Sequence, residues 1–150
     1  MQIEPRYGIV LSEKAVMLEK KDLSRTYILV RPGSGNILGY YSLGMKCVRI
    51  PDDSELKERV RNKMNVDPDT NVAQSYLLGQ LCRSEESVPG LGASMINDAL
   101  DVFKDVKERI GCRLVRIDCD ENIRGYYEDR GFVYIGTNRK KNLCQMVIYI

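Results

Sequence analysis

One segment, Met95–Ile110, constrains the fold more than any other part of this sequence. With about 100° between successive helical residues, its apolar side chains fall on roughly half of the circumference and its charged side chains on the other half. Gly111 follows at once, where a left-handed glycine commonly ends a helix. We therefore predict a long amphipathic helix with one face packed on a sheet. The residues of that face are Met95, Ile96, Ala99, Leu100, Val102, Phe103, Val106 and Ile110.

Segments with the pattern of β-strands precede and follow this helix in the sequence. Residues 24–50 predict two strands joined by the turn Pro32–Asn36, and Ala73–Arg83 predicts a central strand. The order predicts an α/β (α+β) fold in one domain, residues 1–150, with helices on the faces of a mixed sheet. The other predicted elements are strands at 113–119, 132–136 and 143–150, and helices at 11–23 with Ser12 as N-cap, 52–64 with Asp52 and Glu55 as a capping pair, and 120–130.

The composition excludes several kinds of chemistry. The chain has no histidine, which removes Ser-His-Asp and Cys-His catalysis. Its five cysteines are scattered without a Cys-x-x-Cys pair, so we interpret them as reduced thiols and expect no metal site. The net charge of +2 does not by itself require a nucleic-acid partner. Since no signal peptide or membrane-spanning run is readable, we expect a cytoplasmic protein with no membrane partner.

Two glycines one residue apart, Gly90 and Gly92, stand between the predicted central strand and the long helix. Glycines let successive N–H groups converge on one point, and the helix dipole adds partial positive charge there. The arrangement is typical of a phosphate or pyrophosphate site, and equally of plain turn chemistry. Ala93 and Ser94 follow in place of the Lys and Ser/Thr of a Walker P-loop. A Rossmann fingerprint is also disfavoured, because the glycines lie past mid-chain after a hairpin.

A second motif, GYYEDRGF at Gly125–Phe132, places a tyrosine pair on a short helix that Gly131 ends. Together with VPGLGASM, about forty residues upstream, it resembles the GNAT superfamily of N-acetyltransferases, which bind acetyl-coenzyme A (acetyl-CoA). The resemblance extends over about residues 25–150. It is similar in particular to bacterial and phage members near the toxin branch that acetylates aminoacyl-tRNA. It implies a mostly antiparallel, twisted sheet with a central splay.

The resemblance also implies roles for individual residues. The N–H groups of residues 90–93 would hold the pyrophosphate of the coenzyme, and strand residues 81–83 would pair with its pantetheine arm. Ser87 stands where the family prefers Gln or Arg, and Pro89 donates no N–H. Tyr127 would be the general acid that protonates the departing thiolate. The residues implied to bind acetyl-CoA are Leu81, Cys82, Arg83, Ser87, Gly90, Leu91, Gly92, Ala93 and Asn122.

Alternatives remain open for individual side chains. Tyr126 and Tyr127 also fit core aromatic residues whose hydroxyls bond to the backbone. Cys82 invites an acetyl-cysteine intermediate, but without a histidine to activate its thiol we favour a buried packing residue. The sequence does not identify the general base. Its candidates, for which solvated charge or helix capping is favoured, are Asp118, Asp120, Glu85 and Glu86.

The acceptor is predicted only as a primary amine, on a small molecule, a protein or an aminoacyl-tRNA. The basic stretches Lys57–Lys63 and Asn138–Asn142 fit an RNA-binding face, although a charge run is usually only a solvated face. A degenerate scaffold that binds coenzyme A or a protein partner without catalysis is the other alternative. The apolar C-terminal stretch Leu143–Ile150 leaves open a homodimer formed by strand pairing.

Overall fold

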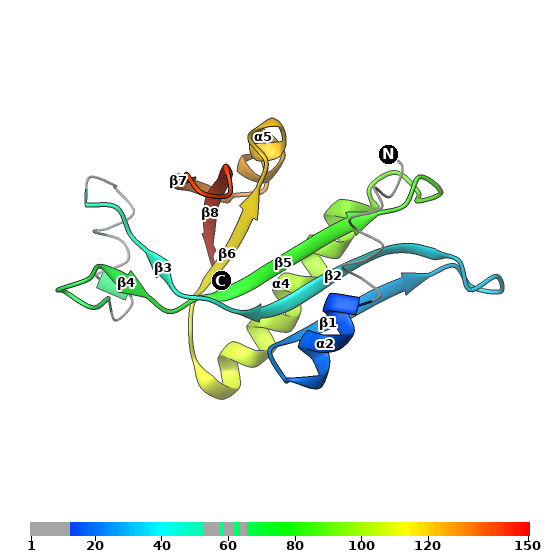
Figure 1. The fold of residues 1–150 in the computed structure, drawn as a ribbon, viewed down its shortest axis with the longest axis horizontal. Coiled ribbons are helices and arrows are strands. Elements are labelled where there is room, and N and C mark those ends of the chain that lie inside the picture. The colour runs from blue at the N-terminus through cyan, green and yellow to red at the C-terminus, as the bar shows by residue number, and fades with distance from the viewer. Residues whose placement is uncertain (1–12, 53–57, 59–61, 64–65) are drawn as a thin grey trace. The chain divides into compact units, whose positions relative to one another are not determined.

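The computed structural model of the chain describes residues 13–52, 58, 62–63 and 66–150, with the helices and strands labelled in Figure 1. Its helical elements are α2 (Ala15–Lys20), α4 (Leu91–Ile110), the 3-10 helix η2 (Glu121–Ile123) and α5 (Arg124–Glu128). Its strands are β1 (Ser24–Val30), β2 (Ile37–Met45), β3 (Val48–Arg49), β4 (Val72–Ala73), β5 (Tyr76–Arg83), β6 (Leu114–Cys119), β7 (Val133–Asn138) and β8 (Leu143–Tyr149). Within these described residues, no helix has the length and apolarity to cross a membrane.

The main sheet has six strands in the order β1-β2-β5-β6-β8-β7, while β3 and β4 form a separate two-stranded sheet. Pairing is antiparallel between β1 and β2, between β6 and β8, and between β7 and β8. The predicted architecture, a mostly antiparallel mixed sheet flanked by helices, is confirmed; the central splay stays a prediction. The chain divides into two compact units, each described by itself below. Unit 1 comprises Met1–Gly44 and Leu78–Val102, and unit 2 comprises Met45–Leu77 and Phe103–Ile150.

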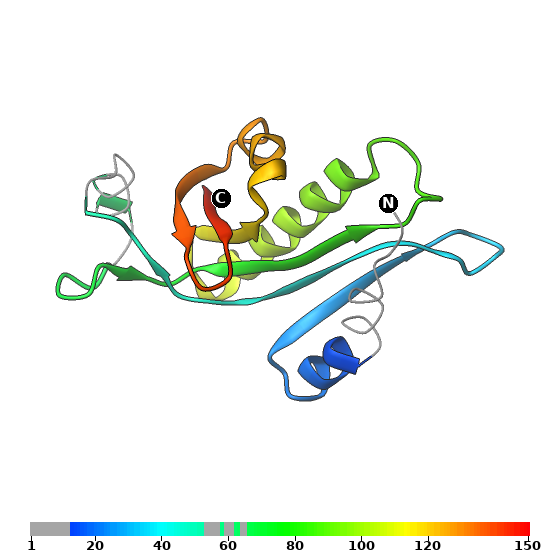
Figure 2. The same cartoon turned by 45° about the horizontal axis from the view of Figure 1, so that its top comes forward.

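Unit 1 contains the β1–β2 hairpin, most of β5 and the N-terminal part of α4 (Figure 2). Gly39 on β2 lets α4 come close, because a Cβ there would lie only 3.0 Å from the Met95 Sδ atom. The fully buried Tyr41 also donates its hydroxyl proton to Asp98 on α4. The N-terminal part of α4 is thereby held against β2 by both packing and a hydrogen bond. Other buried residues of this unit are Tyr40, Leu43, Leu78, Cys82, Ile96 and Ala99.

Unit 2 contains β6, β8 and β7 together with the small β3–β4 sheet. Phe103, in the C-terminal part of α4, stacks on Tyr76 with ring centroids 4.8 Å apart. The buried Tyr76 hydroxyl donates to the Gly111 carbonyl, so its polar end is satisfied where the helix ends. A buried cluster joins the two sheets through Val48, Ile50, Ala73, Leu114, Ile135 and Val147.

Two predicted strands are interrupted in the structure. The strand predicted at Ala73–Arg83 breaks at residues 74–75 into β4 and β5, and the second hairpin strand breaks after Met45 into β2 and β3. Hydrogen bonds join the residues at the two breaks. The Lys46 N–H donates to the Ser75 carbonyl at 3.0 Å, and the buried Ser75 hydroxyl donates to the Lys46 carbonyl. This side-chain bond to the backbone competes with a continuous strand ladder.

The helices also differ from their predicted bounds. The helix predicted at residues 11–23 ends earlier than expected, since α2 stops at Lys20 and Asp22 adopts a left-handed φ of 56°. The long helix begins earlier than predicted, at Leu91, and Gly111 ends it with a φ of 81° as predicted. Its predicted apolar face is largely covered, but Ile110 is 68% exposed. The predicted N-cap Ser12 and most of the predicted helix 52–64, including Glu55, lie outside the described residues.

The C-terminal strand β8 lies inside the sheet, between β6 and β7. One of its edges pairs with β6 from Leu114 to Cys119, and the other pairs with β7. The predicted alternative, a homodimer formed by pairing residues 143–150 with a second subunit, is therefore wrong. Both backbone edges of β8 already have partners. The strands at the ends of the sheet order are β1 and β7.

Candidate functional site

The N-terminal end of α4 is the feature of unit 1 that best fits an anionic ligand. Gly90 precedes the helix with a left-handed φ of 84°, and no atom lies within 4 Å of the position its Cβ would take. The Ser94 N–H makes the first helical hydrogen bond, to the Gly90 carbonyl at 3.1 Å. The Leu91 N–H donates to the Val88 carbonyl at 3.3 Å. Of the two glycines predicted to shape this loop, only Gly90 needs the conformation that glycine allows, because Gly92 lies inside the helix.

Three backbone donors remain at this end of α4. The N–H groups of Gly90, Gly92 and Ala93 have no acceptor within the described part of the chain. Helix geometry explains the last two, since N–H groups of a first turn have no carbonyl four residues earlier in the helix. The 20 residues of α4 add the partial positive charge of their aligned peptide dipoles. Three donors and partial positive charge suit a phosphate group.

The other residues of unit 1 that are predicted to bind the coenzyme precede α4 in the chain. Leu81 is half-buried, Cys82 is buried and Arg83 is exposed at the end of β5. The Ser87 N–H donates to the Ser84 carbonyl at 3.1 Å, which closes a turn in the loop. Burial raises the pKa of the Cys82 thiol. Because a protonated thiol is a poor nucleophile, the structure favours packing over an acetyl-cysteine intermediate at Cys82.

Tyr127 is the buried residue of α5 in unit 2, with 4% of its surface exposed. Its ring makes edge-on contacts with Tyr126 and Phe132, at centroid separations of 5.4 and 5.6 Å. Burial, and after it the nearby Cys119 thiol, raises the pKa of the phenol above its ordinary value. The ring thus packs as a core aromatic residue, as the alternative interpretation predicts, but its hydroxyl makes no hydrogen bond to the backbone within the described part of the chain.

The end of α5 explains how the sequence places this tyrosine. The Tyr127 carbonyl accepts the N–H groups of Arg130 at 3.0 Å and Phe132 at 3.1 Å. Gly131 makes this closure possible with a left-handed φ of 88°, as a glycine after a helix commonly does. The chain then turns directly into β7, with Phe132 buried against the Tyr127 ring.

Tyr126 and Asn122 lie on the surface of unit 2. Tyr126 is 37% exposed, and the Arg130 guanidinium lies 3.5 Å from its ring centroid. The core-aromatic interpretation of Tyr126 is therefore wrong, because neighbouring tyrosines of a short helix point to different sides. Asn122 is exposed on η2.

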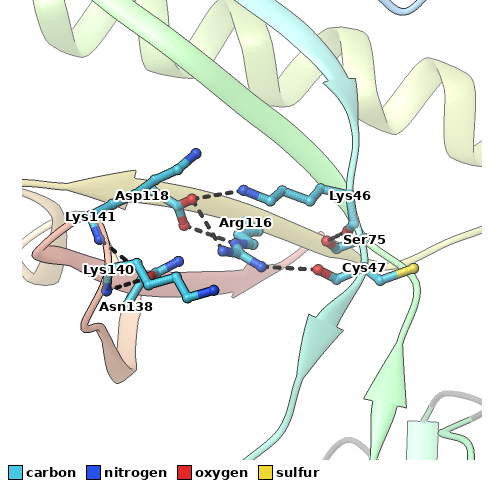
Figure 3. Close-up of polar contacts among 8 residues, drawn as sticks. All are labelled: Lys46, Cys47, Ser75, Arg116, Asp118, Asn138, Lys140 and Lys141. Atoms are coloured by element: carbon cyan, nitrogen blue, oxygen red, sulfur yellow. Dashed lines mark hydrogen bonds and ion pairs between the residues drawn. The ribbon is translucent and has the colours of Figure 1, made fainter.

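Asp118, a candidate general base, is instead part of an ion-pair network in unit 2 (Figure 3). The buried Arg116 places Nε 2.8 Å and Nη2 3.1 Å from the two carboxylate oxygens of Asp118, and Lys46 Nζ lies 3.2 Å away. Burial alone would raise the pKa of Asp118, but the hydrogen bonds and charges of Arg116 and Lys46 outweigh it and lower the pKa. A carboxylate held in this way is a poor proton acceptor at neutral pH.

The other candidate bases, Glu85, Glu86 and Asp120, are exposed. Glu86 accepts a hydrogen bond from Asn36 Nδ2 at 3.2 Å, and the Asp120 carbonyl accepts the Ile123 N–H. None of these contacts assigns a base, so the base stays unidentified. No group of three or more His, Cys, Asp or Glu residues in the described ranges is arranged to hold a metal ion.

The sequence predictions missed the contacts of Arg116 and Arg31. Arg116 and Asp118 are two residues apart on one strand and so share a face, a signal that could have paired them. Arg116 also donates to the Cys47 carbonyl at 2.9 Å, which ties β6 to the break after β2. The contact of Arg31 joins it to Glu86, 55 residues away in the sequence, and no local pattern indicates it.

No family model and no curated protein sequence matches the chain. Solved structures match over nearly its whole length. The structure of AtaT complexed with acetyl-methionyl-tRNAfMet superposes with a TM-score of 0.75 at 21% identity, covering 95% of this chain and 81% of that chain. The structure of AtaTR bound with AcCoA superposes with a TM-score of 0.73 at 23% identity, covering 97% of this chain and 81% of that chain. The structure of a Tyr-to-Phe mutant of KacT superposes with a TM-score of 0.74 at 19% identity, covering 95% of this chain and 81% of that chain.

These superpositions establish the class of fold: the chain shares the fold of these structures, the GNAT-like fold expected from its motifs. The solved structures that share this fold include those of AtaT, a toxin, and of KacT. At 19 to 23% identity the likeness concerns the fold.

Proposed function

We propose that this chain is an acetyl-CoA-dependent N-acetyltransferase that transfers the acetyl group to a primary amine by direct attack in a ternary complex. One observation carries the proposal: Gly90, Gly92 and Ala93 offer three N–H groups without acceptors among the described residues, at the N-terminal end of a long helix. The shared fold supports it, because AtaTR has been solved with AcCoA bound.

In unit 1, the proposed role is to bind the coenzyme through its backbone. The N–H groups at the start of α4 hold the pyrophosphate, and Leu81–Arg83 pair with the amide-rich pantetheine arm as an added strand would. Ser87 and the exposed Asn122 of unit 2 are the further predicted coenzyme contacts. Pro89 has no N–H to contribute, so the site depends on the donors that follow it.

In unit 2, the proposed role is proton transfer by Tyr127. The neutral amine attacks the thioester carbonyl, the C–S bond of the tetrahedral intermediate breaks, and the thiolate takes the phenol proton. Burial raises the pKa of Tyr127, so the phenol holds this proton throughout the neutral pH range and is a weaker acid than a free tyrosine. The nitrogen loses its proton to water, from which Tyr127 is reprotonated.

Thermal melting with and without coenzyme A tests the proposal. A ligand at a hundred times its dissociation constant adds about 2.7 kcal/mol of stability, which we expect to raise the Tm by roughly 5–10 °C. Transfer of labelled acetyl groups to a panel of amines then tests catalysis. No Tm shift at millimolar coenzyme A would favour the non-catalytic scaffold instead.

A second observation favours aminoacyl-tRNA as the acceptor, which would be met in the cytoplasm. The turn after β7 is exposed and carries Arg139, Lys140 and Lys141 in succession. Asn138 Oδ1 accepts the N–H groups of both lysines, at 3.0 and 3.4 Å, so the turn is ordered by its own side chain. AtaT has been solved with acetyl-methionyl-tRNAfMet, which gives this acceptor a precedent on the same fold. The other basic stretch, Lys57–Lys63, lies mostly outside the described residues.

Salt dependence distinguishes this acceptor from a small amine. Each phosphate contact releases counterions, so KM for charged tRNA should rise steeply with salt, while KM for a small amine should change little. Replacing Lys140 and Lys141 by alanine should weaken tRNA binding and reduce the salt slope by about one per lost contact. The matched control replaces Lys20 and Lys21, an exposed lysine pair of unit 1.

A further inference from the structure

The loop that carries Gly90 is tied to the β1–β2 hairpin turn in unit 1. Residues 84–90 connect β5 to α4, and the Ser84 N–H donates to the Leu38 carbonyl at 2.9 Å. Arg31 Nη2 donates to the Glu86 carbonyl at 3.0 Å, and Asn36 Nδ2 donates to the Glu86 carboxylate at 3.2 Å. Figures 1 and 2 show the turn and the loop at the same end of these strands.

The hairpin turn has a defined shape of its own. The Arg31 N–H donates to the Asn36 carbonyl at 2.8 Å, and the Gly35 N–H donates to the Arg31 carbonyl at 3.1 Å. Gly33 and Gly35 take left-handed φ angles of 86° and 73°. Arg31 and Asn36 therefore face each other across the base of the turn, and both side chains reach the same residue of the loop.

The loop also carries a contact within itself and two acidic side chains. The contact of Ser87 within it is a backbone one, its N–H to the Ser84 carbonyl. Glu85 and Glu86 place two negative charges close in sequence to N–H groups that suit an anion. The Arg31 guanidinium donates to the backbone carbonyl of Glu86, and the Asn36 amide donates to its carboxylate.

We propose that Arg31 and Asn36 are positioning residues for the coenzyme: by holding Glu86, they fix the loop so that the N–H groups of Gly90, Gly92 and Ala93 converge on the pyrophosphate. This inference rests on the proposed function. Neither side chain touches the reacting atoms. Their effect is on the affinity for the pyrophosphate part of the coenzyme and leaves the chemical step unchanged.

Calorimetric titration of the full chain with coenzyme A gives the first test. Since a hydrogen bond of this kind contributes about 0.5–1.5 kcal/mol, Arg31→Ala should raise the Kd about three- to tenfold. Arg31→Lys keeps a charged donor and should retain most of the affinity. The matched control is Arg25→Ala, which removes an exposed arginine of β1 that pairs with Asp22 at 2.7 Å, and its Kd should equal that of the unchanged chain.

The second test compares two acetyl donors. In Arg31→Ala, KM for acetyl-CoA should rise while kcat is kept, and KM for S-acetylpantetheine, which lacks the pyrophosphate, should not change. Equal losses with both donors, or an unchanged Kd for coenzyme A, would overturn the inference while leaving the proposed function intact. If the unchanged chain binds no coenzyme, the proposed function fails instead.

A second variant keeps the inference testable if Arg31→Ala does not melt cooperatively. Asn36→Asp replaces a donor by a carboxylate that repels Glu86, so it should weaken coenzyme A at least as much as Arg31→Ala does. Asn36→Ala, which only removes the donor, should have the smaller effect. If Asn36→Asp, Asn36→Ala and the unchanged chain all bind coenzyme A with the same Kd, the positioning role is contradicted.

Discussion

The loop before α4 in unit 1 and the helix α5 in unit 2 carry their candidate functions in opposite ways. The loop and the helix start offer the N–H groups of Gly90, Gly92 and Ala93, residues with no side chain or a single methyl group. Helix α5 offers one side-chain oxygen, on a tyrosine that is 4% exposed and whose pKa is raised by burial. One region depends on the path of the backbone, and the other depends on the surroundings of a single phenol.

This difference predicts different responses to substitution. A backbone site tolerates changes of side chain, which is why Ser87 is compatible with it. It is sensitive only to changes that alter the path of the chain. A site made of one hydroxyl is lost with that hydroxyl, however well the fold is kept. Substitutions in the loop should therefore reduce affinity by degrees, whereas substitution of Tyr127 should reduce the rate of the chemical step.

The largest expected effect is that of Tyr127→Phe. Loss of the proton donor should lower kcat by about 10²–10⁴-fold and leave the Kd for coenzyme A nearly unchanged. Steady-state kinetics and calorimetry on the same preparation measure both quantities. Tyr126→Phe is the matched control, because it removes the neighbouring exposed hydroxyl and should keep kcat. An unchanged kcat in Tyr127→Phe would remove the contrast between the two regions.

The next largest effect concerns two buried groups of unit 2. Tyr127 is proposed to act in the reaction, whereas Asp118 is expected only to stabilise the fold. Asp118→Asn leaves the buried Arg116 without its counter-charge, so the free energy of unfolding should fall by about 3 kcal/mol. The exposed Asp120→Asn should stay within about 0.5 kcal/mol of the unchanged chain. Urea unfolding measures both, and kcat of the folded Asp118→Asn protein should be close to normal. A large loss of kcat would return Asp118 to the role of base.

The same variant has an expected pH signature. The folded-state pKa of Asp118 is lowered from 3.8, so its contribution to stability is present above that value and is lost as pH falls toward the folded-state pKa. Asp118→Asn should therefore lose less stability between about pH 5 and pH 2 than the unchanged chain does. Parallel acid dependences of the two proteins would contradict the ion-pair assignment.

The smallest effect compares one glycine from each region. Gly90→Ala forces a side-chain residue into a φ of 84°, at a cost of about 1–2 kcal/mol, although its Cβ would meet no atom within 4 Å. The loop should shift and the Kd for coenzyme A should rise about tenfold, with kcat kept at saturating acetyl-CoA. Gly125→Ala in α5 also adds a Cβ to open space, but without positive φ, and should leave the Kd unchanged. Equal Kd values for the two variants would show that the loop path does not determine affinity.

The sequence by itself determined the features that depend on neighbouring residues. The 3.6-residue period predicts the long helix, and Gly111 and Gly131 mark the ends of α4 and α5 because glycine adopts left-handed backbone at little cost. The adjacent helix end and glycine loop predict a backbone anion site. The position of Tyr127 before a closing glycine likewise follows from a local pattern.

Only the tertiary structure decided what depends on residues far apart in the chain. The breaks in two predicted strands follow from bonds between Lys46 and Ser75, and the support of the loop follows from Arg31 reaching Glu86. The internal place of β8 depends on its pairing with β6 and β7, since an apolar strand looks the same in sequence whether its edges are open or paired. Such contacts are set by packing among whole elements, and for that reason no local period or spacing could predict them.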